Sequence, residues 1–179
     1  MHIKLKRIYD KLETDRNNLL SELTSIPEDQ LQQIPAPGKW SIVYTLTHIL
    51  TAERMSLIYM KKKSLGVAEL DDSGILEALK FRFLQASQRI PMLKFKAPKA
   101  VVEHTPTSVS FDTLKTQWEK SRRDLRDFLD SIEEKNVHKK IYKHVVVGRL
   151  DAIQGVGFLR EHFIHHLPQL KKQIRAVKR

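Results

Sequence analysis

The chain has 179 residues, 41% of them hydrophobic, which is enough for one domain with a substantial core. It contains no cysteine, which excludes disulfides, thiolate metal sites and cysteine nucleophiles. The net charge of +11 permits contact with nucleic acid, but its lysine and arginine clusters end two predicted helices, where cations complement the helix dipole. No segment reaches the roughly 18 apolar residues of a membrane span, and the N-terminus lacks the apolar core of a signal peptide. We therefore expect a single cytoplasmic domain over residues 1–179, without membrane contact and without nucleic acid as its main partner.

Several long segments carry apolar residues three and four positions apart, which predicts an all-α fold. The first helix is expected from about Ile3 to Leu23, before a loop, "QIPAPGKWS", whose prolines and glycine stop a helix. The second helix is expected to begin at Ser41 as its N-cap. Its segment "SIVYTLTHILTA" has no charged residue and should be buried. A shorter helix is expected over roughly Ser73 to Ile90.

The long segment "PMLKFKAPKAVVEHTPTSVS" predicts a crossover that leads to an amphipathic helix beginning near Ser110. The inward stripe of that helix consists of Phe111, Leu114, Trp118, Leu125, Phe128, Leu129 and Ile132. In the next connection, "IYKHVVV" alternates as a short extended segment does. Asp151 and Gln154 form a variant of the capping box and predict the start of the last helix. Four long helices, an extra short helix and a long crossover predict a four-helix bundle.

Three of the eight histidines lie in the last helix, in the segment "REHFIHHLPQLKKQ". At about 100° per residue, His162 and His166 fall on one side of the apolar sector, whereas His165 falls nearly opposite it and is expected to be exposed. Histidines at i and i+4 can bind one metal ion, although the spacing also arises by chance. His48 is the candidate third ligand, because an imidazole in an uncharged helix is costly unless something binds it. The alternative is that His48 is a core histidine hydrogen-bonded to tyrosine or backbone.

The remaining histidines lie at the N-terminus, in connections or in a lysine-rich stretch, and no role is expected for them. They are His2, His104, His138 and His144.

Two blocks, "PGKWSIVYTLTHILTAE" and "GRLDAIQGVGFLREHFIHHLPQLKKQI", are similar to the DinB-like superfamily, the group that contains the YfiT-type metal-dependent hydrolases. The resemblance spans most of the chain, including "FKAPKAVVEHTPTSVSFDTLKTQWEKSRRDLRDFL" before the last helix. The family's motif residues fall here on Trp40, Ser41, His48, His162, His166 and Gln169. The resemblance implies an up-down-down-up four-helix bundle in which three histidines at one end hold a divalent metal ion, usually nickel or zinc. Bundles of this family often dimerise, so a homodimer is one expected state.

Pro168 lies inside the last helix, where it removes a backbone donor and clashes with the carbonyl of Ile164. We therefore expect a kink directly after His166, which would affect how this ring is aimed.

Three neutral imidazoles would leave a bound ion its full charge and an open position, which is typical of a catalytic metal site. Two chemistries then compete: attack by metal-bound hydroxide on an ester or amide, and attack by a metal-bound thiolate on an electrophile. Hydrolysis usually needs a carboxylate base, but on the helical projection Glu53 lies away from the face of His48 and Glu161 points away from the core sector. A thiol needs no such base, because coordination itself lowers its pKa.

The resemblance favours the thiol route, because some relatives in the superfamily are thiol-dependent S-transferases or isomerases. The predicted function is therefore the activation of a low-molecular-weight thiol for reaction with a small-molecule substrate. A metal-dependent hydrolase is the alternative, and a non-catalytic helical bundle that binds metal or nucleic acid is a further one.

Overall fold

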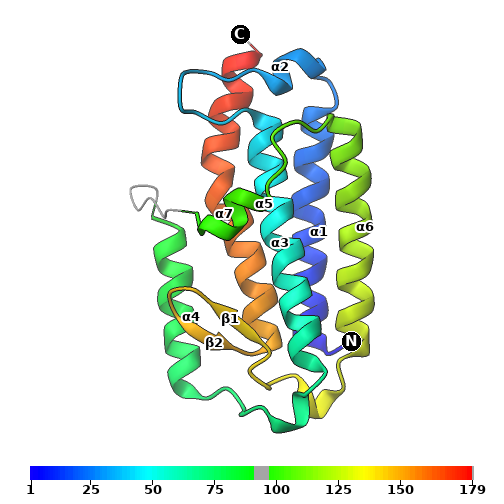
Figure 1. The fold of residues 1–179 in the computed structure, drawn as a ribbon, viewed down its shortest axis with the longest axis vertical. Helices are drawn as coiled ribbons and strands as arrows, with labels where there is room; N and C mark the ends of the chain where they lie inside the picture. The colour runs from blue at the N-terminus through cyan, green and yellow to red at the C-terminus, as the bar shows by residue number, and fades with distance from the viewer. Residues whose placement is uncertain (91–96, 179) are drawn as a thin grey trace.

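The structure is a computed structural model, and it describes residues 1–90 and 97–178. Its long helices are α1 (Ile3–Leu23), α3 (Ile42–Ser64), α6 (Phe111–Ser131) and α7 (Ala152–Val177). In Figure 1, α1 and α7 run upward and α3 and α6 run downward, so the bundle has the expected up-down-down-up order. Helices α1 and α3 each pack against both α6 and α7. The predicted all-α four-helix bundle is confirmed.

The helices that carry the candidate histidines begin at side-chain caps. The Ser41 hydroxyl accepts a hydrogen bond from the Tyr44 backbone N–H at 3.0 Å, at the start of α3. At the start of α7, Asp151 Oδ1 accepts from the Gln154 N–H at 2.8 Å, and Gln154 Oε1 accepts from the Asp151 N–H at 3.1 Å. Both predicted caps are confirmed. They fix where each helix starts and therefore which face of it each later residue occupies.

The uncharged first half of α3 is buried almost throughout, as its sequence predicts. The expected inward stripe of α6 is also buried, except that Ile132 just beyond the helix is only half-buried. On α1, Ile8 and Leu20 are likewise half-buried at the edge of the core.

A charged pair lies inside the bundle and joins three helices. Glu53 of α3 is 3% exposed and accepts two hydrogen bonds from the Arg122 guanidinium, at 2.7 and 3.1 Å, and one from the Trp118 indole at 2.9 Å. Arg122 also donates to Glu13 of α1 at 3.1 Å. Glu53 therefore faces α6 and α1, and it lies away from the face of His48 as predicted.

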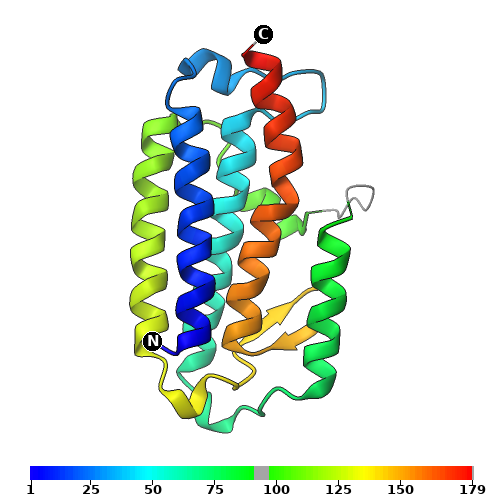
Figure 2. The ribbon, with the colours of Figure 1, turned by 180° about the vertical axis from the view of Figure 1, so that it is seen from behind.

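Helix α4 (Ile75–Gln88) is the predicted extra short helix, and it lies against the outside of α7 (Figure 2). The approach is close, because a Cβ atom on Gly157 would come within 2.6 Å of the Phe81 ring. Beyond the end of α4, Arg89 donates two hydrogen bonds to the Glu161 carboxylate of α7, both at 2.8 Å. Helix α7 is thus covered on two sides, by the bundle and by α4.

Smaller elements complete the described chain. They are α2 (Glu28–Gln32), the 3₁₀ turns η1 (Val67–Glu69) and η2 (Glu134–Asn136), α5 (Lys99–His104), and an antiparallel hairpin of β1 (Tyr142–His144) and β2 (Gly148–Leu150). The extended segment predicted from "IYKHVVV" is confirmed by β1. The sequence did not predict α2 or α5, and the start of the expected crossover, residues 91–96, lies outside the described residues.

Helix α7 continues past Pro168 to Val177 without interruption. The proline therefore does not end the helix, and the angle of the expected kink stays a prediction. Within the described part of the chain, no helix is both long enough and apolar enough to cross a bilayer.

Candidate metal centre

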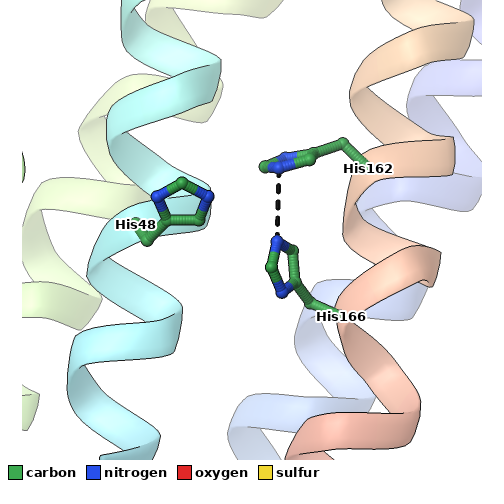
Figure 3. A group of neighbouring side chains, drawn as sticks. All are labelled: His48, His162 and His166. Atoms are coloured by element: carbon green, nitrogen blue, oxygen red, sulfur yellow. Dashed lines mark hydrogen bonds between the residues drawn. The ribbon is translucent and has the colours of Figure 1, made fainter. Parts of the chain in front are cut away.

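The structure brings His48, His162 and His166 together in the space between α3 and α7, and we call these residues the three-histidine cluster (Figure 3). The Nε2 atoms of His162 and His166 are 3.3 Å apart. One ring nitrogen from each of the three histidines lies within 4.8 Å of the others. The cluster lies in the first third of α3 and near the middle of α7, rather than at the very end of the bundle as the family resemblance implies.

These separations fit a metal site. Two imidazole nitrogens that each lie about 2.0–2.1 Å from a tetrahedral zinc ion are about 3.3 Å apart. The His162–His166 pair already has this spacing, and a modest closure by His48 would complete a shell of three nitrogens. His162 is half-buried, and its inaccessible Nδ1 has no hydrogen-bond partner among the described residues, which is costly for a polar atom.

The interior location holds all three rings in their neutral form. Burial lowers the pKa of His48 to about 4 and that of His166 to about 3. Burial, followed by the positive charge that the neighbouring rings would carry, lowers the pKa of His162 well below its ordinary value. Since a metal ion binds the neutral imidazole, the cluster is in its binding-competent state near pH 7.

A chain of hydrogen bonds orients the His166 ring. Its Nδ1 lies 3.5 Å from Gln169 Oε1, and the Gln169 amide donates to the Thr45 hydroxyl of α3 at 3.1 Å. Thr45 in turn donates to the Ser41 carbonyl oxygen at 2.8 Å. With its proton on Nδ1, His166 presents Nε2 to the cluster as an acceptor, which is how outer hydrogen bonds commonly fix a metal-binding histidine.

Trp40 closes one side of the cluster. Its ring centre is 4.9 Å from that of His48 and 6.3 Å from that of His166, with the second pair stacked. The Gln173 side chain of α7 donates a hydrogen bond to the Trp40 carbonyl oxygen and holds the preceding loop against α7. The resemblance marked Trp40 as a motif residue, and the structure gives it this packing role.

A pocket of about 770 Å³ opens beside the cluster, between α3, α7, α5 and the β1–β2 hairpin. Its described wall is mostly apolar, with Met55, Tyr59, Val101 and Phe158 among its members, and it includes all three cluster histidines. No aspartate or glutamate belongs to this described wall. Glu161, the other carboxylate considered from the sequence, is buried against Arg89 beyond α4 instead.

The prediction that His165 is exposed is wrong. Its ring is half-buried on the pocket wall, and its Nδ1 lies 3.0 Å from the Gln88 backbone oxygen at the end of α4. The helical projection treated the bundle as the only neighbour of α7, whereas α4 covers the opposite side of that helix.

His144, for which the sequence predicts no role, is 7% exposed and lines the pocket. A signal was present in the sequence, since the alternation of β1 places His144 on the same buried face as Tyr142. The other histidines lie elsewhere: His2 caps α1, His138 contacts Asp151, and His104 is exposed at the end of α5.

The family comparison agrees with this geometry, since the family model of the DinB superfamily matches residues 11–170. The chain belongs to the DinB superfamily. The matched part of this DinB-superfamily chain includes His48, His162 and His166. No curated protein and no solved structure matches it. The family and the buried three-histidine cluster together fit a metal-binding protein.

Proposed function

We propose that this DinB-superfamily chain is a divalent-metal-dependent enzyme in which His48, His162 and His166 hold the ion. Nickel and zinc are the proposed metals, since imidazole ligands suit both. The observation that carries the proposal is the convergence of three buried, neutral imidazoles on a pocket with no carboxylate in its described wall. Three protein ligands leave at least one coordination position for a substrate group or water, as in catalytic rather than structural metal sites.

We propose a small thiol as the group that is activated, in a reaction of the S-transferase type. When bound, the divalent ion would lower the pKa of a thiol or water molecule that coordinates it. Water usually needs a nearby base as well, and the described pocket wall supplies no carboxylate for that purpose. Glu53 is held by Arg122 and Glu161 by Arg89, so neither carboxylate is available to the pocket.

The residues around the cluster would prepare this reaction. Gln169 holds His166 with Nε2 toward the cluster, and the Trp40 and Phe158 rings cover the imidazoles and exclude water from their faces. The apolar pocket would hold an electrophilic small molecule next to the activated group. A low-molecular-weight thiol is abundant in a reducing compartment, so we propose the cytoplasm as the site of action.

Metal analysis of protein purified without a histidine tag tests the ligand assignment. We expect close to one divalent ion per chain in the wild type. The triple variant His48→Ala, His162→Ala and His166→Ala should bind none while it retains its helical content. Stoichiometric metal in a folded triple variant would contradict the assignment.

The reaction type needs a second experiment. Addition of mercaptoethanol to the cobalt-substituted protein should produce a sulfur-to-metal charge-transfer band, and the His48→Ala variant should lack it. The companion assay follows thiol consumption with a chloro-dinitrobenzene electrophile and compares it with hydrolysis of a nitrophenyl ester in the absence of thiol. If the ester is hydrolysed readily and thiols only inhibit, the metal-dependent hydrolase replaces the transferase. If neither reaction occurs over a broad set of substrates, the non-catalytic bundle is favoured.

A further inference from the structure

A fourth buried imidazole, His144, lies on the pocket wall outside the three-histidine cluster. Its ring centre is 4.5 Å from that of Phe158, and the Phe158 ring is 5.7 Å from that of His162. Phe158 therefore contacts both His144 and the cluster, and His144 is not a member of the group of candidate metal ligands.

The turn of the hairpin determines which nitrogen of His144 carries the proton. The backbone N–H groups of Val146 and Val147 donate to His144 Nδ1 at 3.2 and 3.4 Å. Nδ1 can accept these bonds only if it carries no hydrogen, so the proton is on Nε2. Burial also lowers the pKa of His144 to about 4, and the ring is therefore neutral near pH 7.

The Nε2–H group of His144 is a donor that needs an acceptor. The ring is more than nine-tenths buried and lines the pocket, and none of the hydrogen bonds among the described residues uses its Nε2. Nε2 is not among the inaccessible unpaired atoms of the described residues, so it is open to the pocket, where a ligand oxygen can replace water as its acceptor.

The other described residues of the pocket wall indicate the polarity and charge of such a ligand. Most of the lining side chains are apolar or aromatic, among them Met55, Tyr59, Pro98, Val101 and Val145. Apart from the histidines, the one ionisable cation in this described wall is Lys143, and no carboxylate belongs to it. A cationic ligand would find no carboxylate partner here, whereas an apolar ligand with a single polar oxygen would match the wall.

We propose that the substrate is an apolar small molecule that carries a carbonyl or similar acceptor oxygen, and that His144 binds this oxygen through Nε2–H. The oxygen would lie at His144, next to Phe158 and beside the three-histidine cluster, so that His144 sets how the substrate is oriented relative to the metal. The orienting role rests on the proposed function, but the hydrogen bond itself requires no metal.

Acetophenone and ethylbenzene are suitable matched probes, because they share an apolar ring and differ in the carbonyl oxygen. Calorimetric titration gives the affinity ratio of the two probes for the wild type and for two variants. His144→Asn keeps an acceptor oxygen near the position of Nδ1 for the turn, but it removes the Nε2 donor. His144→Gln places an amide N–H near the position of Nε2 and removes the acceptor for the turn.

We expect the acetophenone-to-ethylbenzene affinity ratio to fall about fivefold in His144→Asn, the size of one net hydrogen bond, with the ethylbenzene affinity unchanged. His144→Gln should recover most of the wild-type ratio. An unchanged ratio in His144→Asn, or an equal fall in both variants, would overturn the proposal. The wild type also gives a test without substitution: the His144 imidazole resonances should show the Nε2–H tautomer, and the Nε2 proton should shift with acetophenone but not with ethylbenzene.

Titrations of the protein as purified, with its metal content measured, and again after chelation separate this inference from the proposed function. A preference for acetophenone that depends on His144 in both samples supports the inference. If the protein as purified holds no metal, that finding counts against the proposed function but not against the inference. A preference that disappears only on chelation would mean that the metal binds the carbonyl, and it would overturn the role of His144. If the metal-loaded protein has the same acetophenone-to-ethylbenzene affinity ratio with and without His144, this inference is wrong and the proposed function is unaffected.

Discussion

At the scale of single residues, the two ring nitrogens of His166 have different partners. Nδ1 faces Gln169 and Nε2 faces His162, so the Gln169 amide determines which nitrogen the cluster receives. Gln169 itself is held by Thr45 on the opposite helix, which makes this contact part of the link between α3 and α7.

Replacement of Gln169 by alanine should therefore weaken metal binding without removing a ligand. We expect Gln169→Ala to lower the affinity about 10- to 100-fold, as is usual when a hydrogen bond that orients a ligand is lost. Competition with a chelator of known affinity measures the effect. Lys172→Ala, on the exposed face of the same helix, is the control and should bind metal as the wild type does. Equal affinities of the Gln169→Ala protein and the wild type would contradict this role.

His165 provides the complementary prediction. It lies on the pocket wall but outside the group of candidate ligands, and its Nδ1 contacts the Gln88 backbone. His165→Ala should keep the full metal content, which elemental analysis measures beside His166→Ala. Loss of metal in His165→Ala but not in His166→Ala would show that His162 pairs with His165 instead.

At the scale of helices, the Glu53–Arg122 pair joins α3 to α6 inside the core. Removal of Glu53 leaves the charge of the buried Arg122 with the more exposed Glu13 as its remaining carboxylate partner. We expect Glu53→Ala to lower the free energy of unfolding by about 3 kcal/mol, because Glu13 compensates only part of the Arg122 charge. Denaturant unfolding measures this loss.

Asp124→Ala is the matched control for Glu53→Ala, since it removes an exposed ion pair with Lys120 on the same helix, α6. It should cost less than about 0.5 kcal/mol. If the two variants lose similar amounts of unfolding free energy, the buried pair stabilises the fold no more than an exposed one.

The elements that the sequence predicts well are those whose pattern is local. The caps at Ser41 and Asp151 and the periodicity of the long helices are properties of adjacent residues, and the bundle follows from them. Helix α2 is different: it is short, and Glu28 is held by the Phe111 backbone N–H at 3.1 Å, a contact with a residue far along the chain. No local pattern encodes such a contact.

The same distinction explains the candidate site. His162 and His166 are predicted to share a face because they are one helical turn apart, and His48 is predicted to join them because an imidazole is costly in an uncharged, buried helix. The positions of His144 and His165 depend on the hairpin and on α4, which cover α7 from outside the bundle. A projection of one helix contains no information about that cover.

At the scale of the whole molecule, the buried histidines make the stability of the metal-free protein depend on pH. The pKa values of His48 and His144 are about 4 in the folded protein, against about 6.5 for a histidine in an unfolded chain. Between these values the unfolded chain binds more protons than the folded one, so stability falls as the pH falls from about 6.5 toward 4. Above about pH 6.5 these groups are neutral in both states and contribute no slope.

Urea midpoints measured across this pH range in the presence of a chelator test the prediction. The decrease should be smaller in His144→Asn, which removes one of the titrating groups, whereas His104→Ala, at an exposed position, should follow the wild type. A wild-type midpoint that stays constant between about pH 6.5 and 4 would contradict the neutral, buried state of these rings.

Helix α7 packs against α1, α3, α4 and β1, and it is the last helix of the matched domain to leave the ribosome during synthesis. Until it emerges, the nascent chain carries His48 alone of the three-histidine cluster, and the apolar faces that α7 covers are open to water. A metal ion therefore has no cluster around which early folding could begin, and chaperones have exposed apolar surface to recognise. Translation that stops before Ala152 yields a polypeptide without His162 and His166, so under the proposed function only chains that include α7 would hold the metal ion.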